Sequence, residues 1–210
     1  MTSIASFAAP IVIGLLSNVA ADLILAWRYR SSFSLDSATR KRVRMLRWVI
    51  AIAGLCLGHV FGLAPLQLVV LSLLSVTAGT DFEHLRLPPG AFLYAATVAG
   101  VCAAYWLYGL PGLQHALLAQ AVWFALMTLS VMLLRRTAGG DIKVMMQYGA
   151  ACGSLSISLI GMLLASAIMI PISLIYWLHH RRPIPRTPLA PLVWLGALAG
   201  LILEKLYVIA

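Results

Sequence analysis

The sequence predicts an all-α fold class, a polytopic membrane bundle of about eight transmembrane helices. Of the 210 residues, 62% are hydrophobic and 10% are charged, and the mean hydropathy is +0.96. Soluble domains are about half apolar and a quarter charged, so a soluble globule is excluded. The apolar runs are too long for barrel strands and do not alternate with period two. Helices are then the remaining way to satisfy the backbone hydrogen bonds in lipid.

The apolar runs give the order of the elements. They fall at 5–27, 46–63, 65–81, 90–110, 114–134, 142–178 and 188–208. The breaks are short and carry turn formers, as in Gly62 to Pro65 and Gly109 to Gly112. The run 142–178 is long enough for two spans of about 17–25 residues. Gly149, Gly153 and Ser154 offer an off-centre break, so the first helix of the pair would be unusually short or partly interfacial. No long linker separates the runs, so we expect residues 1–210 to form a single integral membrane domain.

Basic residues predict the orientation. The chain has 15 Lys and Arg against 6 Asp and Glu, a net charge of +9. Seven of the 15 lie in 28–47, so we interpret that segment as a short basic cytoplasmic loop and place the N-terminus outside. If the run 142–178 crosses the membrane twice, the basic residues that follow it, Arg181, Arg182 and Arg186, are also cytoplasmic. The last run, 188–208, then places the C-terminus outside. The polar surface is too small for a nucleic-acid duplex, so no nucleic-acid partner is expected.

Three of the six acids lie inside or at the end of apolar runs: Asp22, Asp81 and Asp141. A carboxylate at mid-bilayer costs about 2.5–3.5 kcal/mol on insertion scales, and such residues often mark function. For Asp22 we expect an ion pair with Arg28 or Arg30, one to two turns further on.

Asp81 and Asp141 have less ordinary surroundings. Asp81 ends a helix, and Pro88 lies where it suits the first turn of the next. Asp141 follows Gly139 and Gly140, which leave the backbone open so that another chain can approach the carboxylate. The predicted topology puts both acids at the cytoplasmic edge. There one ionised carboxylate could take a proton from water while the other, protonated, donates to a scissile carbonyl, and the two would titrate as a pair.

Two motifs carry a family resemblance. The stretch Asp81-x-Glu83-His84-x-x-Leu87-Pro88, followed by Gly139-Gly140-Asp141-x-Lys143, resembles the type IV prepilin peptidases, which are GxGD-type membrane aspartyl proteases of the prepilin leader peptidase family. The resemblance extends over about 65–205. It implies that Asp81 and Asp141 are catalytic, with Gly139, Gly140, Lys143, Glu83, His84 and Pro88 as substrate-binding or supporting residues.

The sequence departs from this family at two places. Ala138 stands where the first glycine of GxGD is expected. The segment 28–47 has no cysteine, so the cysteine-rich cytosolic domain of the bifunctional members is missing. N-methylation of the new terminus is therefore left open. S-adenosylmethionine would be a cofactor only if that activity is retained, and no other cofactor is expected.

The resemblance implies an aspartyl endopeptidase of the bacterial inner (cytoplasmic) membrane with its active site facing the cytoplasm. It would remove the basic leader of type IV prepilins or type II secretion pseudopilins, cutting after glycine and before an apolar stretch. Membrane lipids are the other expected partners, with anionic headgroups between the basic leader and the cationic loops. The oligomeric state is left open.

Alternatives stay open at this point. Intramembrane acids also serve small proton-coupled transporters, and a non-catalytic pilus or secretion assembly factor is a further candidate. Lys143 would steady the Asp141 carboxylate, bind a substrate acid or contact a headgroup. Glu83 and His84 are also compatible with a solvated loop pair. No two histidines form an i, i+4 zinc pair with a glutamate, so no metal is expected.

Overall fold

The computed structural model describes residues 7–28, 37–84, 87–134, 139–181 and 189–209. Within these ranges the regular elements are the helices α1 (Ala8–Arg28), α2 (Ser37–Val60), α3 (Pro65–His84), α4 (Gly90–Leu134), α5 (Gly139–Cys152), α6 (Leu155–His180) and α7 (Leu189–Ile209). Five of these, all but α3 and α5, are long and apolar enough to cross a membrane. The predicted all-helical, polytopic membrane bundle is confirmed at this level.

Two glycines with positive φ divide the long apolar runs where breaks were expected. Gly109, with φ of 69° and ψ of −153°, interrupts α4, and Pro111 follows it at the start of a second helical stretch. L-residues rarely adopt this φ, which glycine tolerates. Gly153, with φ of 66°, separates α5 from α6. The run 142–178 therefore forms two helices, and the first, at 14 residues, is short as predicted.

The turn between α2 and α3 is built from local hydrogen bonds. Gly62 has φ of 77°, and the next residue, Leu63, donates its backbone N–H to the carbonyl of Gly58 at 3.0 Å. This pattern closes the C-terminal end of α2. The side chain of Gln67 accepts the backbone N–H of Ala64 at 2.9 Å, which caps the start of α3.

Only part of the basic segment 28–47, which was expected to be a loop, lies between α1 and α2. Helix α2 begins at Ser37, so residues 37–47 are helical and precede the apolar part of the same helix. Arg and Lys are good helix formers, and their long stems let the charged ends reach the membrane surface. The helix therefore continues beyond the boundary that hydropathy alone suggests.

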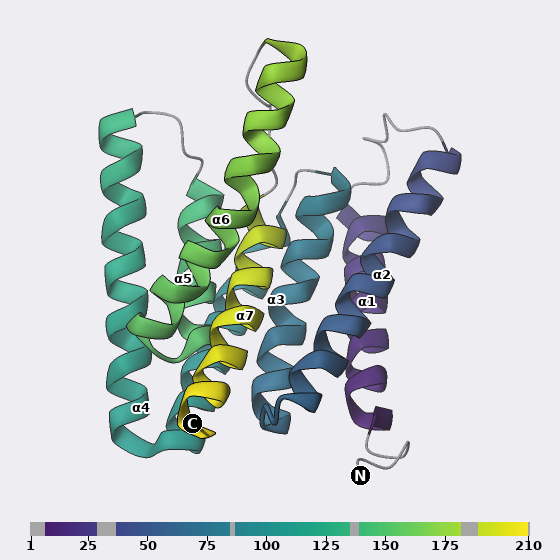
Figure 1. Ribbon diagram of the computed structural model, residues 1–210. Helices are drawn as coiled ribbons and strands as arrows, with labels where there is room; N and C mark the ends of the chain where they lie inside the picture. The colour runs from purple at the N-terminus through teal and green to yellow at the C-terminus, as the bar shows by residue number, and fades with distance from the viewer. Residues whose placement is uncertain (1–6, 29–36, 85–86, 135–138, 182–188, 210) are drawn as a thin grey trace.

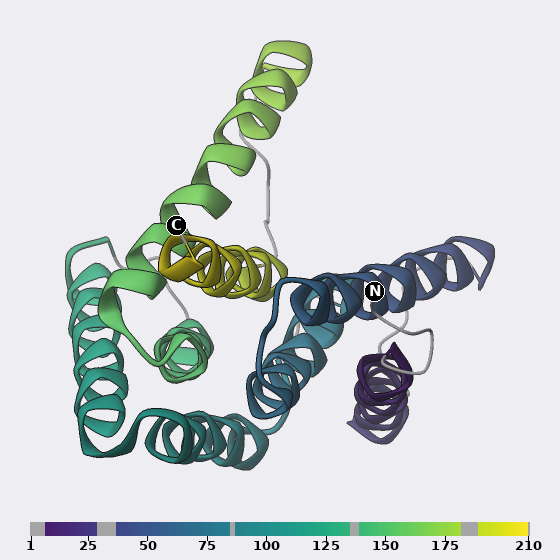
Figure 2. The same cartoon turned by 60° about the horizontal axis from the view of Figure 1, so that its bottom comes forward.

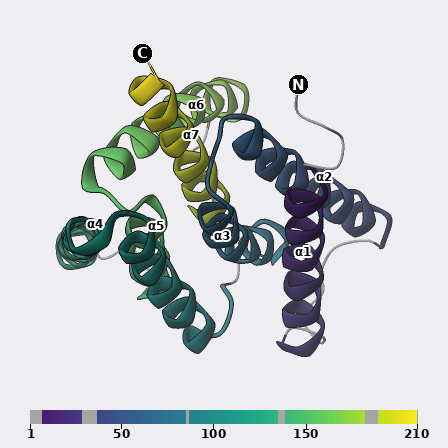
Figure 3. The same cartoon turned by 90° about the horizontal axis from the view of Figure 1, so that it is seen from below.

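The helices run alternately up and down, so that several ends meet at one face of the bundle (Figure 1). The end of α3 and the starts of α4, α5 and α7 all lie at this face, which we call the Asp81 end. The start of α1 and the end of α7 lie at the opposite face. Seen in Figures 2 and 3, α1 and α4 occupy opposite sides of the bundle, with α3 and α7 between them.

Helix α7 holds the bundle together because it packs against both α3 and α6. The indole N–H of Trp194 in α7 donates to the backbone carbonyl of Leu71 in α3 at 3.1 Å, and both residues are buried. On the other side of α7, Gly196 faces Gly161 of α6 so closely that a Cβ on Gly161 would clash with the Gly196 backbone. These contacts hold α7 between α3 and α6.

We expect Gly161→Ala to lower the free energy of unfolding by about 1–3 kcal/mol, because the added methyl group overpacks a contact between two backbones. Thermal unfolding in detergent measures this effect. The matched control is Ala167→Val, which enlarges an exposed position on the same helix and should leave the midpoint unchanged. Equal midpoints for the two variants would contradict the close packing of α6 on α7.

Candidate active site

Asp81 is a buried carboxylate held by the first turn of another helix. It lies near the end of α3, and its side chain is 7% exposed. Its Oδ2 accepts the backbone N–H of Ala190 at 2.8 Å, and the N–H of Leu189 contributes a further hydrogen bond. Both donors belong to the start of α7, where backbone N–H groups have no partner inside the helix and attract negative charge. Asp81 therefore joins the end of α3 to the start of α7.

Asp141 lies close to Asp81. It occupies the first turn of α5 and is half-buried. Although the two acids are 60 residues apart in the sequence, their carboxylates are near enough to interact electrostatically. The fold thus places two acids from different helices, both near helix ends, at the Asp81 end of the bundle. Two neighbouring carboxyl groups of this kind can share a proton and act as a general acid and a general base.

Gly140 has a different local use from the one we expected. A Cβ at this position would lie 2.6 Å from Cδ1 of Leu87, so the chain's own leucine fills the space beside the glycine. The expectation that the glycines leave the backbone open to another chain is therefore corrected for Gly140. The glycine instead lets the segment before α4 pack against the start of α5.

Lys143 is directed toward the start of α4. Its Nζ lies 5.1 Å from the centroid of the Tyr94 ring, within the range of a cation–π interaction. The same Nζ is 3.1 Å from the place where a Cβ on Gly90 would lie. The contact with Tyr94 differs from the partners expected for this lysine, which were a carboxylate and a headgroup. It ties the first turn of α5 to α4.

The other predicted site residues are described only in part. Pro88 is buried just before α4. Glu83 and His84 belong to the backbone of the last turn of α3, and Gly139 begins α5, but their side-chain environments lie outside the described part of the chain. Ala138 falls entirely outside the described residues.

Asp22 forms an ion pair, as predicted. Its partners, however, are arginines of α2, the next helix along the chain. Its Oδ1 accepts a hydrogen bond from Nη2 of Arg47 and lies 3.6 Å from Nε of Arg44. Arg47 is only 5% exposed, whereas Arg44 is 45% exposed. The side chain of Arg28 and all of Arg30, the partners expected from the sequence, lie outside the described residues.

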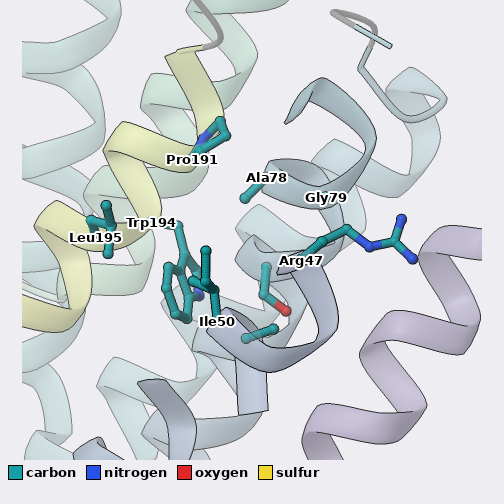
Figure 4. Close-up of a pocket in the computed structure, with 9 residues that line it drawn as sticks. Arg47, Ile50, Ala78, Gly79, Pro191, Trp194 and Leu195 are labelled. Carbon is teal, nitrogen blue, oxygen red and sulfur yellow. The ribbon is translucent and has the colours of Figure 1, made fainter. Parts of the chain in front are cut away.

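Arg47 also reaches α3, a contact that the sequence reasoning missed. A Cβ on Gly79 would lie 2.7 Å from Cδ of Arg47, so the arginine stem crosses α3 two residues before Asp81. Figure 4 shows this side chain extending past Gly79 toward α1. The i, i+3 spacing of Arg44 and Arg47 was the available signal, because it places both bases on one side of α2.

A cavity of about 130 Å³ adjoins this arginine, between α2, α3 and α7. Ala78 and Gly79 line it on α3, and Pro191 and Trp194 line it on α7 (Figure 4). Among the described residues that line it, Arg47 alone is charged and Ser75 adds a hydroxyl group, so the cavity offers no carboxyl group for acid–base catalysis. Among the described residues no group of three His, Cys, Asp or Glu side chains could hold a metal ion.

Comparison with known proteins gives one match. The model of the type IV leader peptidase family matches residues 68–175, just over half of the chain, and this range contains both Asp81 and Asp141. Helices α1 and α2, and the start of α7 that binds Asp81, lie outside it. No curated protein and no solved structure matches the chain.

We expect Arg47→Gln to destabilise the fold by about 3 kcal/mol, because breaking a buried ion pair removes the partner of a charged group. Arg44→Gln is the matched control, since it removes an exposed base from the same carboxylate and should cost less than about 1 kcal/mol. Thermal unfolding of both variants in detergent measures the difference. Equal losses of stability would contradict the assignment of Arg47 as the main partner of Asp22.

Proposed function

This chain belongs to the type IV leader peptidase family, and from that membership we propose that it is an aspartyl endopeptidase removing the leader of type IV prepilins or type II secretion pseudopilins. The family suggests prepilin leader cleavage by a multi-pass membrane protein, and no cysteine-rich domain is evident in the 210 residues. We treat residues 1–210 as one peptidase domain. The observation that carries the proposal is that the fold brings Asp81 and Asp141, both inside the matched range, near enough to interact electrostatically.

In the proposed reaction Asp81 and Asp141 share one proton and bind one water molecule between them. The ionised carboxylate takes a proton from the water as its oxygen attacks the scissile carbonyl carbon, and the protonated carboxyl donates to the carbonyl oxygen. Collapse of the tetrahedral intermediate breaks the C–N bond and passes a proton to the leaving amine. The backbone N–H groups of Leu189 and Ala190 orient Asp81 throughout.

The other residues of the proposed site have supporting roles. Gly140 packs under Leu87, and Lys143 binds the Tyr94 ring, so both fix the start of α5 that carries Asp141. We propose Gly139, Glu83, His84 and Pro88 as further supporting residues on the basis of the motif alone.

The proposed substrate has a short basic leader, a glycine and an apolar helix. That helix would lie in the bilayer beside the enzyme and leave the scissile bond at the membrane surface. We place the Asp81 end at the cytoplasmic face of a bacterial inner membrane, because basic residues such as Arg28 at the end of α1, and Lys41 and Arg42 in the first turns of α2, belong to helix ends at this face. Anionic headgroups would bridge the cationic leader and the cationic face.

We expect Asp81→Asn and Asp141→Asn each to reduce cleavage at least about 100-fold, since each removes one proton-transfer group. The measurement is loss of the leader from a precursor that carries a basic leader, a glycine and an apolar helix, with purified protein in detergent. Glu204→Gln is the control, because this acid lies in α7 far along the helix from Ala190 and should retain activity. Full activity in either aspartate variant, with intact folding, would overturn the assignment.

The proposed topology has eight crossings with both termini outside, counting residues 90–108 and 110–134 of α4 separately. We therefore expect alkaline phosphatase fused after Ala210 to be active, since this enzyme folds only outside the cytoplasm. The same reporter fused within 135–138 should be inactive. An active fusion at 135–138 would show that the Asp81 end faces outward.

A further inference from the structure

A buried hydrogen bond connects the two helices that carry the acids. The hydroxyl of Thr77 in α3 donates to Oε1 of Gln147 in α5 at 3.0 Å, across 70 residues of sequence. Both side chains are fully enclosed, with exposures of 0% and 2%. Neither residue belongs to the motifs that resemble the peptidase family.

The hydrogen bond lies between one and two helical turns from each acid. Thr77 is four residues before Asp81, which is about 6 Å along the helix axis. Gln147 is six residues after Asp141, or about 9 Å, but a helical side chain leans toward the N-terminus of its helix and so back toward Asp141. Because α3 ends and α5 begins at the Asp81 end, the bond sets the axial register of α5 against α3 (Figure 1).

Helix α7 packs against both α3 and α5, largely through apolar residues, whereas the Thr77–Gln147 hydrogen bond joins α3 to α5 directly. Helix α3 packs chiefly against α7 and α1, whereas α5 packs chiefly against α4. The two acids therefore lie on helices with different main neighbours, and direct contact between α3 and α5 is limited. The residues of α5 around Gln147 that enter the core, Val144, Met145 and Tyr148, are mainly apolar. Apolar contacts are non-directional and constrain sliding weakly, whereas a hydrogen bond requires one geometry.

The polar pair is a poor choice for stability alone. Nε2 of Gln147 is buried and has no hydrogen-bond partner among the described residues. A buried donor without a partner costs about 1–3 kcal/mol, and replacing both members of such a pair by apolar groups of similar shape is nearly neutral. What an aliphatic pair could not supply is the fixed register between the two helices.

We propose that Thr77 and Gln147 are positioning residues, whose hydrogen bond holds the Asp81 and Asp141 carboxylates at a common depth. The proposal rests on the peptidase function proposed above. Neither side chain takes part in proton transfer; the pair acts through the placement of α5 relative to α3. A misplacement of about 1 Å can lower a rate by about 100-fold.

The decisive variant is Thr77→Val combined with Gln147→Leu, which removes the hydrogen bond and the buried donor together. We expect an unchanged thermal midpoint, a kcat about 10- to 100-fold lower and an unchanged KM for the precursor. Thr77→Ser keeps the hydroxyl and should retain most of kcat. Thr97→Val is the matched control, because the hydroxyl of this buried threonine bonds only within α4, to the carbonyl of Leu93, and should leave kcat unchanged.

A kcat equal to that of the unaltered protein in the double variant would overturn the proposal. So would a kcat that falls only in proportion to the folded fraction, since that is what a purely stabilising pair would give. These outcomes leave the proposed function intact because the unaltered protein still cleaves the precursor.

A second readout does not depend on cleavage. Asp81→Cys and Asp141→Cys are introduced into a chain whose three native cysteines, Cys56, Cys102 and Cys152, are replaced by alanine. We expect a short bifunctional thiol reagent to cross-link the pair, and Thr77→Val with Gln147→Leu to slow that cross-linking several-fold. An unchanged rate, or no cross-linking in either background, would overturn the proposal. Absence of cleavage by the unaltered protein together with slowed cross-linking would reject the proposed function and support the positioning role.

Discussion

The arrangement of the candidate site depends on one interaction, the hydrogen bonding of the Asp81 carboxylate to the first turn of α7. A buried carboxylate needs hydrogen-bond donors, and the start of α7 supplies them through backbone N–H groups. Because Trp194 ties the same helix to Leu71, α3 and α7 are joined at two levels. The helix that provides the donors lies outside the range matched by the family model, so the site is completed by a part of the chain that the match does not include.

Asp22 and Asp81, two acids that lie within the bundle, are stabilised in different ways. Asp22 is neutralised by arginines of α2, and one of these, Arg47, is itself buried against α3 at Gly79. Asp81 receives backbone N–H groups rather than a base. Backbone N–H groups and arginines both favour an ionised carboxylate, but the donors to Asp81 belong to the start of a helix and so fix the direction of the group, and Asp141 lies near enough to interact with it electrostatically. The two acids therefore differ in what holds them, which is arginine side chains for Asp22 and the start of a helix for Asp81.

The two acids of the pair are carried by helices with different neighbours. Asp81 is fixed through α7, whereas Asp141 is placed by α4 and the segment before it, through the packing of Gly140 on Leu87 and of Lys143 on Tyr94. The small Gly140 allows the close approach of Leu87, and the Thr77–Gln147 hydrogen bond joins α3 directly to α5. A pair assembled in this way depends on the register between the helices as much as on the residues of the motifs.

Hydropathy and glycine placement were enough to predict the membrane bundle, the breaks at Gly109 and Gly153 and the short α5, because these follow from local backbone chemistry. The motifs around Asp81 and Asp141 were sufficient to identify the family. The partners of Asp22 and Asp81, the contact of Leu87 with Gly140 and the Thr77–Gln147 bond were decided only by the tertiary structure. Each joins residues of different helices, and hydropathy along one chain carries no information on which helices become neighbours or at what register.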